Sequence, residues 1–277
     1  INPNFGVLSF LYTHACGHLL RSILRQRWIA KLFSCYQKST RSKRAIPKFI
    51  DHYSINMNEF IEPIGGFRSF NDFFIRALKP KARTIAQEKH LAIAPSDCKA
   101  YVIPSISTNT HFFAKHQPFT LEQFLGSTTL AQQFAGGTLF MFRLAPYDYH
   151  RFHFPTACKP STPERIKGSL ESVNPIAFMH GIQPLITNER NLITLDTEQF
   201  GTVLMIPIGA MMVGAIHYTY TPNTHYTKGA EAGYFSFGGS TVVLIFKEGV
   251  ITPRADFIKN SLQGFETAVT MGEMINE

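Results

Sequence analysis

The chain has 277 residues, 44% of them hydrophobic, so it can bury a proper core as one domain or as one domain with an appendage. Lysine and arginine outnumber aspartate and glutamate by 27 to 19, and the formal net charge of +8 favours an anionic partner. The four cysteines show no C-x-x-C spacing, so neither a disulfide framework nor a structural zinc site is indicated.

The N-terminal fifth of the chain combines an apolar period with concentrated positive charge. Apolar residues recur at positions 19/20, 23/24, 28, 32/33 and 36, which is the spacing of an amphipathic helix. Basic residues fall mostly between these positions and continue beyond them: Arg21, Arg25, Arg27, Lys31, Lys38, Arg41, Lys43, Arg44 and Lys48. They interrupt any apolar run of the about 20 residues that a membrane span needs. Two interpretations stay open: a helix on an anionic membrane surface, or an ordinary helix that packs its apolar stripe on the core.

The pattern changes from helical to β-rich along the chain. Pro63, Gly65 and Gly66 indicate that the helical region ends near residue 65. Beyond about residue 92, short β-rich runs alternate with turn residues: Gly137–Arg143, Leu192–Leu195, Gly201–Pro207 and Thr241–Phe246. We therefore predict an α+β protein, with an N-terminal amphipathic helical region (1–65) on a mainly antiparallel, β-rich catalytic body (66–277).

The segment Phe237-Gly238-Gly239-Ser240-Thr241 comes directly before a strand-like run. Two glycines before a serine let the backbone bend sharply, and they remove side chains that would obstruct attack of the serine oxygen on the preceding carbonyl. The bond between Gly239 and Ser240 is therefore a candidate site of self-cleavage. Ser127 has similar neighbours, but it follows a helix-like start and is expected to cap the next segment. We therefore favour Ser240.

Three further side chains are candidates for proton transfer. His150 and His153 lie three residues apart beside a predicted strand end, and imidazole titrates near neutral pH. Asp97 follows Pro95 in a turn, where its carboxylate could orient an imidazole, although aspartate after proline is most often turn chemistry alone. The same three side chains also form a plausible zinc site, so a zinc-dependent hydrolase stays open as an alternative.

An ordered set of segments resembles the phosphatidylserine decarboxylases, the pyruvoyl-dependent family with a Gly-Gly-Ser-Thr cleavage motif. The resemblance covers most of the chain from about Ser69 onward, and its specificity lies in the order of the whole set. The segments are Ser69–Arg76 with Leu78-Lys79-Pro80, the Asp97 turn, Tyr149–His153, Asn188-Glu189-Arg190, Val213-Gly214, and Lys228-Gly229 leading to Gly238–Thr241.

This resemblance implies decarboxylation of phosphatidylserine to phosphatidylethanolamine and CO2, after autocatalytic cleavage at Gly239-Ser240. It implies that Ser240 becomes a covalent pyruvoyl group, that Asp97 and His153 activate Ser240 for the cut, and that His150 serves decarboxylation. It assigns no metal.

The implied partners are phosphatidylserine in a membrane, the membrane surface itself and a second copy of the chain in a homodimer. The implied location is peripheral, on the cytoplasmic face of the cell membrane. A nucleic-acid partner is not expected, because no recognised binding motif accompanies the basic residues. The non-enzymatic alternative is a membrane-binding homologue that no longer matures.

Overall fold

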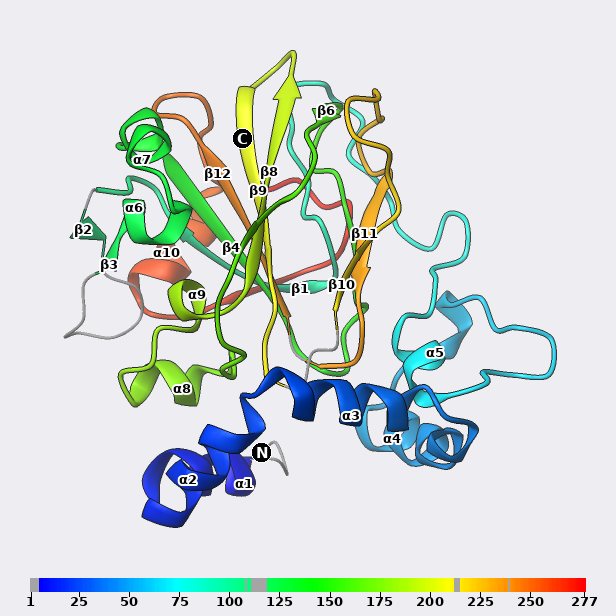
Figure 1. Ribbon diagram of the computed structural model, residues 1–277. Coiled ribbons are helices and arrows are strands. Elements are labelled where there is room, and N and C mark those ends of the chain that lie inside the picture. The colour runs from blue at the N-terminus through cyan, green and yellow to red at the C-terminus, as the bar shows by residue number, and fades with distance from the viewer. Residues whose placement is uncertain (1–4, 108, 111–118, 212–214, 239) are drawn as a thin grey trace.

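The computed structural model describes residues 5–107, 109–110, 119–211, 215–238 and 240–277. Two antiparallel sheets form the body, and the N-terminal helices lie across one end of it (Figure 1). The predicted α+β class, with N-terminal helices and a β-rich body, is confirmed. None of the described helices is long and apolar enough to span a bilayer.

The larger sheet has eight strands in the order β13-β1-β4-β12-β9-β8-β6, with β7 also paired to β8. All of these pairs are antiparallel. Four strands, β4, β8, β9 and β12, are those that the sequence predicts. The strands are β1 (Cys98–Ile103), β4 (Thr138–Leu144), β6 (Lys159–Pro160), β7 (Glu164–Ile166), β8 (Arg190–Thr197), β9 (Gly201–Ile208), β12 (Ser240–Phe246) and β13 (Thr267–Val269).

Strand β12 lies in the interior of this sheet, between β4 and β9, and every one of its residues is buried. Val242, Leu244 and Phe246 point to one face, and Val243 and Ile245 to the other. A strand that is buried on both faces has a continuous apolar sequence rather than an alternating one, which explains why this run is easy to recognise.

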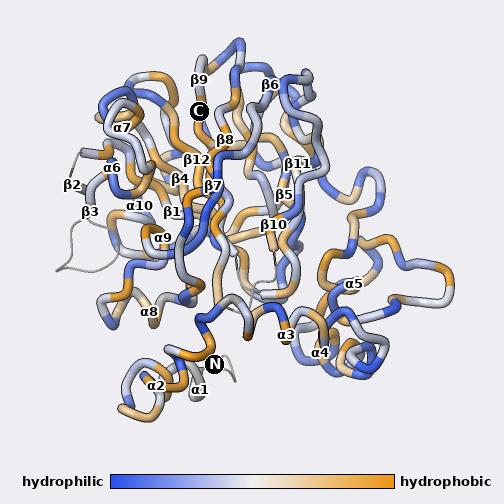
Figure 2. Tube along the Cα trace, in the orientation of Figure 1, coloured by the Kyte–Doolittle hydropathy of each residue, from blue (hydrophilic) through white to orange (hydrophobic). Residues whose placement is uncertain are grey.

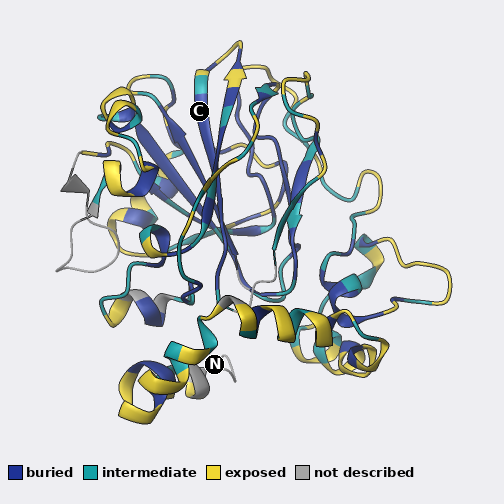
Figure 3. Ribbon diagram, in the orientation of Figure 1, coloured by how far each residue is buried: buried dark blue, intermediate teal, exposed yellow. Residues whose placement is uncertain are grey.

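Each face of the large sheet is covered by a different layer. A three-stranded antiparallel sheet packs on the face of Val242 and Leu244; it consists of β10 (Ile216–Tyr218), β11 (Glu231–Phe235) and β5 (Arg151–His153). The helices α6 (Leu121–Leu125), α7 (Thr128–Phe134) and α9 (Pro184–Thr187) pack on the opposite face. Figure 2 shows hydrophobic residues concentrated in the central strands, and Figure 3 shows the same strands buried. The remaining elements are α8 (Pro175–Met179), α10 (Ala255–Leu262), β2 (Asn109–Thr110) and β3 (Phe119–Thr120).

The helix predicted between residues 19 and 36 is interrupted, because Arg25 and Gln26 separate two helices. Gln26 has an extended conformation, with ψ of 139°. Contacts far away in the sequence explain the break: Arg25 donates a hydrogen bond to Glu171, whereas Phe33 in the second helix packs against Phe237. The N-terminal elements are α1 (Phe5–Thr13), α2 (Ala15–Leu24), α3 (Arg27–Gln37), η1 (Thr40–Ala45), α4 (Ile46–Tyr53), η2 (Met57–Glu59) and α5 (Phe70–Phe74).

Most of the apolar stripe on α2 and α3 faces outward. Leu19, Trp28 and Leu32 are 68%, 58% and 62% exposed, and both helices are largely exposed in Figure 3. The interpretation that this stripe packs on the core is therefore wrong, while the membrane-surface interpretation stays a prediction.

A small hydrophobic cluster combines residues from both sides of the predicted boundary between residues 65 and 66. Ile46 of α4 packs there with Phe67 and with Phe70, Phe73 and Phe74 of α5. The first residues of the predicted body are thus packed with the helical region, and the boundary itself stays a prediction.

Candidate active site

Ser240 is the first residue of β12 and is completely buried. It pairs with Leu144 of β4. Its hydroxyl oxygen has no hydrogen-bond partner among the described residues, which is unusual for a buried polar atom and leaves the oxygen available for chemistry.

The backbone before Ser240 takes a conformation that only glycine adopts readily. Gly238 has a φ of 136°, so a side chain at this position would strain the backbone. One residue earlier, the Phe237 N–H donates to Oδ1 of Asn71 over 3.1 Å, and this bond fixes the segment to α5. The predicted site residue Gly239 lies outside the described residues, as do Val213 and Gly214.

The structure places His150 beside this segment. The His150 ring packs on Phe74 with ring centres 3.9 Å apart, and Phe74 in turn contacts Phe237 at 4.9 Å. Nδ1 of His150 lies 2.9 Å from the Asp148 carbonyl oxygen, so Nδ1 carries the proton and donates it. The lone pair is therefore on Nε2, which is buried and has no well-formed hydrogen bond to any described residue.

Burial keeps the His150 imidazole neutral, because it lowers the pKa to about 3. The hydrogen bond to the Asp148 backbone opposes this lowering of the pKa, the positive charge of Arg76 adds to it, and the Gly238 backbone opposes it. A neutral imidazole with an unoccupied Nε2 can accept a proton at this position.

His153 has different surroundings. Its Nδ1 donates to the Gly229 carbonyl oxygen over 2.9 Å, and its Nε2 accepts from the Tyr149 hydroxyl over 3.0 Å. Burial lowers the pKa of His153 as well. Both ring nitrogens of His153 are therefore hydrogen-bonded, in contrast to His150.

Asp97 is held by Arg83 rather than by a histidine. The Arg83 guanidinium bonds both carboxylate oxygens, over 3.0 and 2.6 Å, and the Met271 N–H donates to Oδ1 over 2.9 Å. Arg83 also pairs with Glu59 at 2.7 Å. Among the described residues, no hydrogen bond joins Asp97 to His153, although the carboxylate is near enough to raise the pKa of that histidine slightly. The roles predicted for Asp97 and His153 stay predictions.

Three residues that the sequence analysis did not single out complete the surroundings. Arg83 binds Asp97, Asn71 binds Phe237, and Arg76 donates to the carbonyl oxygens of Tyr147 and Asp148 over 3.0 and 3.4 Å. Asn71 and Arg76 belong to the Ser69–Arg76 segment, one of the segments on which the family resemblance rests, so that resemblance could have pointed to them. Arg83 had no comparable signal.

In the described part of the chain, no group of three histidine, cysteine, aspartate or glutamate side chains is arranged to hold a metal ion. Asp97, His150 and His153 are consequently not brought together as a ligand set. The zinc-hydrolase alternative loses the geometry on which it depended.

Together, the buried serine at a strand start, the glycine-specific backbone at Gly238 and the neutral histidine beside this segment define a β-rich protein with a candidate self-processing site. The family model for phosphatidylserine decarboxylase matches residues 70–277. The chain belongs to the phosphatidylserine decarboxylase family, as the sequence resemblance predicted.

Similar proteins cover nearly the whole chain. This chain is 41% identical to the phosphatidylserine decarboxylase proenzyme of Chlamydia pneumoniae, over 99% of this chain and 92% of that protein. The proenzyme of Chlamydia caviae is 40% identical, over 97% of this chain and 90% of the relative. The proenzyme of a Chlamydia trachomatis serovar L2 strain is 38% identical, over 98% and 91%. The prediction of an enzyme of this carboxy-lyase family is confirmed.

Proposed function

We propose that this chain decarboxylates phosphatidylserine to phosphatidylethanolamine and CO2, by means of a pyruvoyl group that it makes from its own Ser240. Membership of the family supports the reaction, and the word proenzyme in the relatives' names supports a maturation step. The observation that carries the proposal is the buried Ser240 hydroxyl, which has no partner among the described residues and lies two residues after Gly238, whose φ is 136°.

The cleavage step uses atoms of the chain alone. The Ser240 oxygen loses its proton and attacks the Gly239 carbonyl carbon, and the peptide bond becomes an ester as the nitrogen is released. Loss of the Ser240 α-proton then breaks the ester by β-elimination, with Gly239 leaving as a carboxylate. Water hydrolyses the remaining dehydroalanine to pyruvoyl and ammonia. Asp97 and His153 are proposed to activate Ser240 here.

The surroundings of Ser240 fit the resulting group. Three buried polar atoms there have no partner among the described residues: Ser240 Oγ, Thr241 Oγ1 and His150 Nε2. When present, a pyruvoyl group would supply a carbonyl for the substrate amine and an acceptor for the electrons released as CO2 departs. His150 is proposed to relay the proton that the substrate α-carbon then receives: its unoccupied Nε2 would take a proton from water and pass it on, with the ring fixed by Phe74.

We propose that the protein binds its substrate at a membrane surface. The exposed apolar stripe on α2 and α3 supports this proposal, because exposed residues such as Trp28 and Leu32 gain by burial in a bilayer. A peripheral position on the cytoplasmic face of the cell membrane and a homodimer remain part of the proposal.

The test compares Ser240→Ala with Ser127→Ala. We expect the Ser240→Ala chain to stay uncut and to release no CO2 from phosphatidylserine, because the attacking oxygen is gone. Ser127 only caps α7, where its hydroxyl accepts from the Leu130 N–H over 3.3 Å, so Ser127→Ala should still cut. Denaturing electrophoresis, intact mass and CO2 release are the measurements.

The outcomes separate the alternatives. Cleavage that depends on Ser127 and not on Ser240 would show that the wrong serine was chosen. A wild-type chain that persists as one full-length band would favour a membrane-binding homologue that does not mature.

A further inference from the structure

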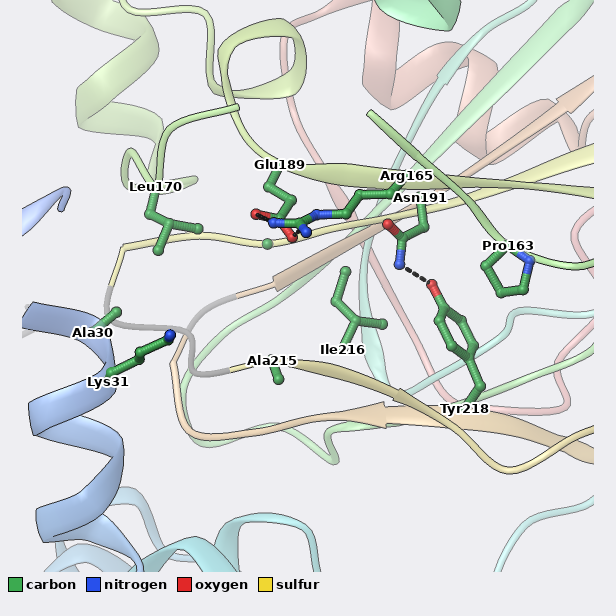
Figure 4. Close-up of a pocket in the computed structure, with 11 residues that line it drawn as sticks. Ala30, Lys31, Pro163, Arg165, Leu170, Glu189, Asn191, Ala215, Ile216 and Tyr218 are labelled. Carbon is green, nitrogen blue, oxygen red and sulfur yellow. Dashed lines mark hydrogen bonds and ion pairs between the residues drawn. The ribbon is translucent and has the colours of Figure 1, made fainter. Parts of the chain in front are cut away.

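A pocket of about 590 Å³ lies between α3 and the two sheets (Figure 4). Lys31 reaches toward it from α3, and the pair Arg165 and Glu189 faces it from β7 and the segment before β8. At its other side, the Asn191 amide donates to the Tyr218 hydroxyl over 2.6 Å. The pocket thus combines charged groups with an amide and a hydroxyl.

Two of its walls flank the segment that contains Ser240. Thr241 of β12 is paired with Ile208 of β9, so the neighbour of Ser240 across the two strands is Gly209, which lines the pocket. Ala215, another lining residue, accepts a hydrogen bond from the Ser236 N–H over 3.0 Å. Two residues that line the pocket are therefore backbone neighbours of Ser236 and Ser240.

The pocket and the Ser240 side chain also share one face of the large sheet. Ser240 and Val242 are two residues apart on β12 and therefore share a face, as do Asn191 and Ile193 on β8. Both Val242 and Ile193 point toward the small sheet. The pocket and position 240 consequently lie on the same side of the large sheet.

The charges of the pocket suit a ligand with one negative charge. Two cations and one carboxylate line it, which leaves one positive charge in excess. Arg165 pairs with Glu189 at 2.8 Å, whereas Lys31 forms no ion pair with a carboxylate of the described residues. The Lys31 ammonium is therefore the cation that is available to an incoming anion.

The polar groups of the pocket have unused hydrogen-bonding capacity. The Tyr218 oxygen accepts from Asn191, so its own O–H remains able to donate, and burial raises the pKa of Tyr218 well above its ordinary value. Oδ1 of Asn191 is buried with no hydrogen-bond partner among the described residues. Buried polar atoms are rarely left in this state, and Oδ1 is an acceptor, so the donor end of a polar ligand, such as an ammonium group, rather than its phosphate is expected to complete it.

We propose that this pocket binds the phosphodiester of the phospholipid substrate, with Lys31 as its principal cation. This inference rests on the proposed function. The serine end of the headgroup then points along the Gly209 wall toward position 240. The glycerol end points toward α3, where Leu32 is 62% exposed next to Lys31 in the sequence and faces the proposed membrane.

Binding is measured by calorimetry on the full chain with Ser240→Ala, which cannot turn the lipid over. Dihexanoyl phosphatidylserine below its micellar concentration is the probe, because a soluble monomer removes the effect of membrane attraction. We expect Lys31→Gln to weaken binding about tenfold, as loss of one charge-assisted hydrogen bond does, and Lys31→Arg to restore most of it. Lys48→Gln is the matched control, since Lys48 is an exposed lysine on α4 and does not line the pocket.

Two further probes identify the group that is bound. Inorganic phosphate should bind more weakly than the lipid and should also depend on Lys31, whereas L-serine, which has no phosphodiester, should not depend on Lys31. Equal affinities of Lys31→Gln and Lys48→Gln for the lipid would overturn the proposal. A dependence of L-serine binding on Lys31 would do so too, because the cation would then hold the substrate carboxylate.

The catalytic assay separates this proposal from the proposed function. If the otherwise unmodified chain matures and releases CO2 while Lys31→Gln leaves KM for the soluble lipid unchanged, the pocket assignment fails and the function stands. If binding depends on Lys31 but the unmodified chain releases no CO2, the function fails and the pocket assignment stands.

Discussion

His150 and His153 are three residues apart, yet the ring nitrogens of the two imidazoles differ in their hydrogen bonds. His150 uses Nδ1 to bind the Asp148 carbonyl and leaves Nε2 unoccupied beside the cleavage segment. His153 uses both nitrogens, one on Gly229 and one on the Tyr149 hydroxyl. His153 must therefore release Tyr149 before its Nε2 can take a proton from another group, whereas His150 needs no such exchange.

The two histidines are expected to act in different steps. We predict that His150→Ala still matures but loses at least about a hundredfold in kcat, which is the scale of a lost proton-transfer group. His153→Ala is predicted to remain largely uncut. Band patterns on denaturing gels report maturation, and CO2 release by the cut fraction reports catalysis. An uncut His150→Ala chain together with a cut His153→Ala chain would mean that the two roles are exchanged.

Among single residues, those whose role depends on their sequence neighbours could be predicted, whereas those whose role depends on contacts distant in the sequence could not. Ser127 was expected to cap a helix and does cap α7, because capping depends only on the next three residues. Arg83 was missed, since its bond to Asp97 joins a loop arginine to a turn fourteen residues away, with no periodicity to indicate it. The unoccupied Nε2 of His150 is likewise a property of packing and cannot be read from residue types.

At the scale of elements, α3 and α5 hold Phe237, three residues before Ser240. Phe33 of α3 contacts Phe237 with ring centres 5.5 Å apart, and Asn71 of α5 accepts the Phe237 N–H. Phe74 of α5 joins Phe237 to His150. The helical region therefore contributes to the geometry of the cleavage segment in addition to its exposed outer surface.

This contact predicts that Asn71 positions the segment for cleavage. Asn71→Leu removes the acceptor and leaves the Phe237 N–H unpaired, so we expect cleavage to slow about tenfold, as a misplaced reacting group does. Asn71→Asp keeps an acceptor oxygen at the same position and should cleave close to the wild-type rate. A time course of band appearance after synthesis measures both.

Far-UV circular dichroism of the same samples serves as a check on folding. Identical cleavage rates for Asn71→Leu and wild type, with both chains folded, would contradict a positioning role for Asn71.

The elements differ in how well local sequence determines them. The strands β4, β8, β9 and β12 were predicted because each is a run of apolar and β-branched residues that the core buries. The break at Arg25 and Gln26 was not predicted, because these residues are acceptable in a helix. It depends on Glu171, which Arg25 reaches across 146 residues of sequence.

At the scale of the whole molecule, the exposed apolar residues of α2 and α3 lie at the end of the body where the Ser240 segment and the Lys31 pocket are found (Figure 1). The proposed membrane surface and the proposed headgroup pocket thus share one helix. A lipid held in the pocket could keep its acyl chains in the bilayer.

Vesicle binding is predicted to depend on this stripe. The double variant Trp28→Ser, Leu32→Ser should weaken binding to phosphatidylserine vesicles by more than about tenfold, because it removes two apolar side chains whose burial favours the membrane. Leu262→Ser is the control, since Leu262 is 79% exposed but lies on α10, which packs on β1 and β13. Vesicle flotation measures the bound fraction. A loss as large for Leu262→Ser would indicate that the effect is not specific to the stripe.

The overall organisation was predictable only in outline. The ordered motifs identified the family and the β-rich body, but not the partition of the strands into two sheets. The small sheet includes strands as short as Ile216–Tyr218 and Arg151–His153, which carry too few residues for a period to be recognised. The pocket lies between these sheets, so it could not be inferred before the pairing was known.

The interior position of β12 has a consequence for the mature molecule. With cleavage before Ser240, the strand that joins β4 to β9 belongs to a separate polypeptide of residues 240–277, held by noncovalent contacts: the pairing of β12 and β13 in the sheet, the packing of α10, and hydrogen bonds such as that from Met271 to Asp97. Unfolding then becomes a dissociation, so its midpoint temperature should rise with protein concentration. Once separated, the long piece lacks its central strand and has no peptide link to recover it, so thermal inactivation is governed by the rate of unfolding.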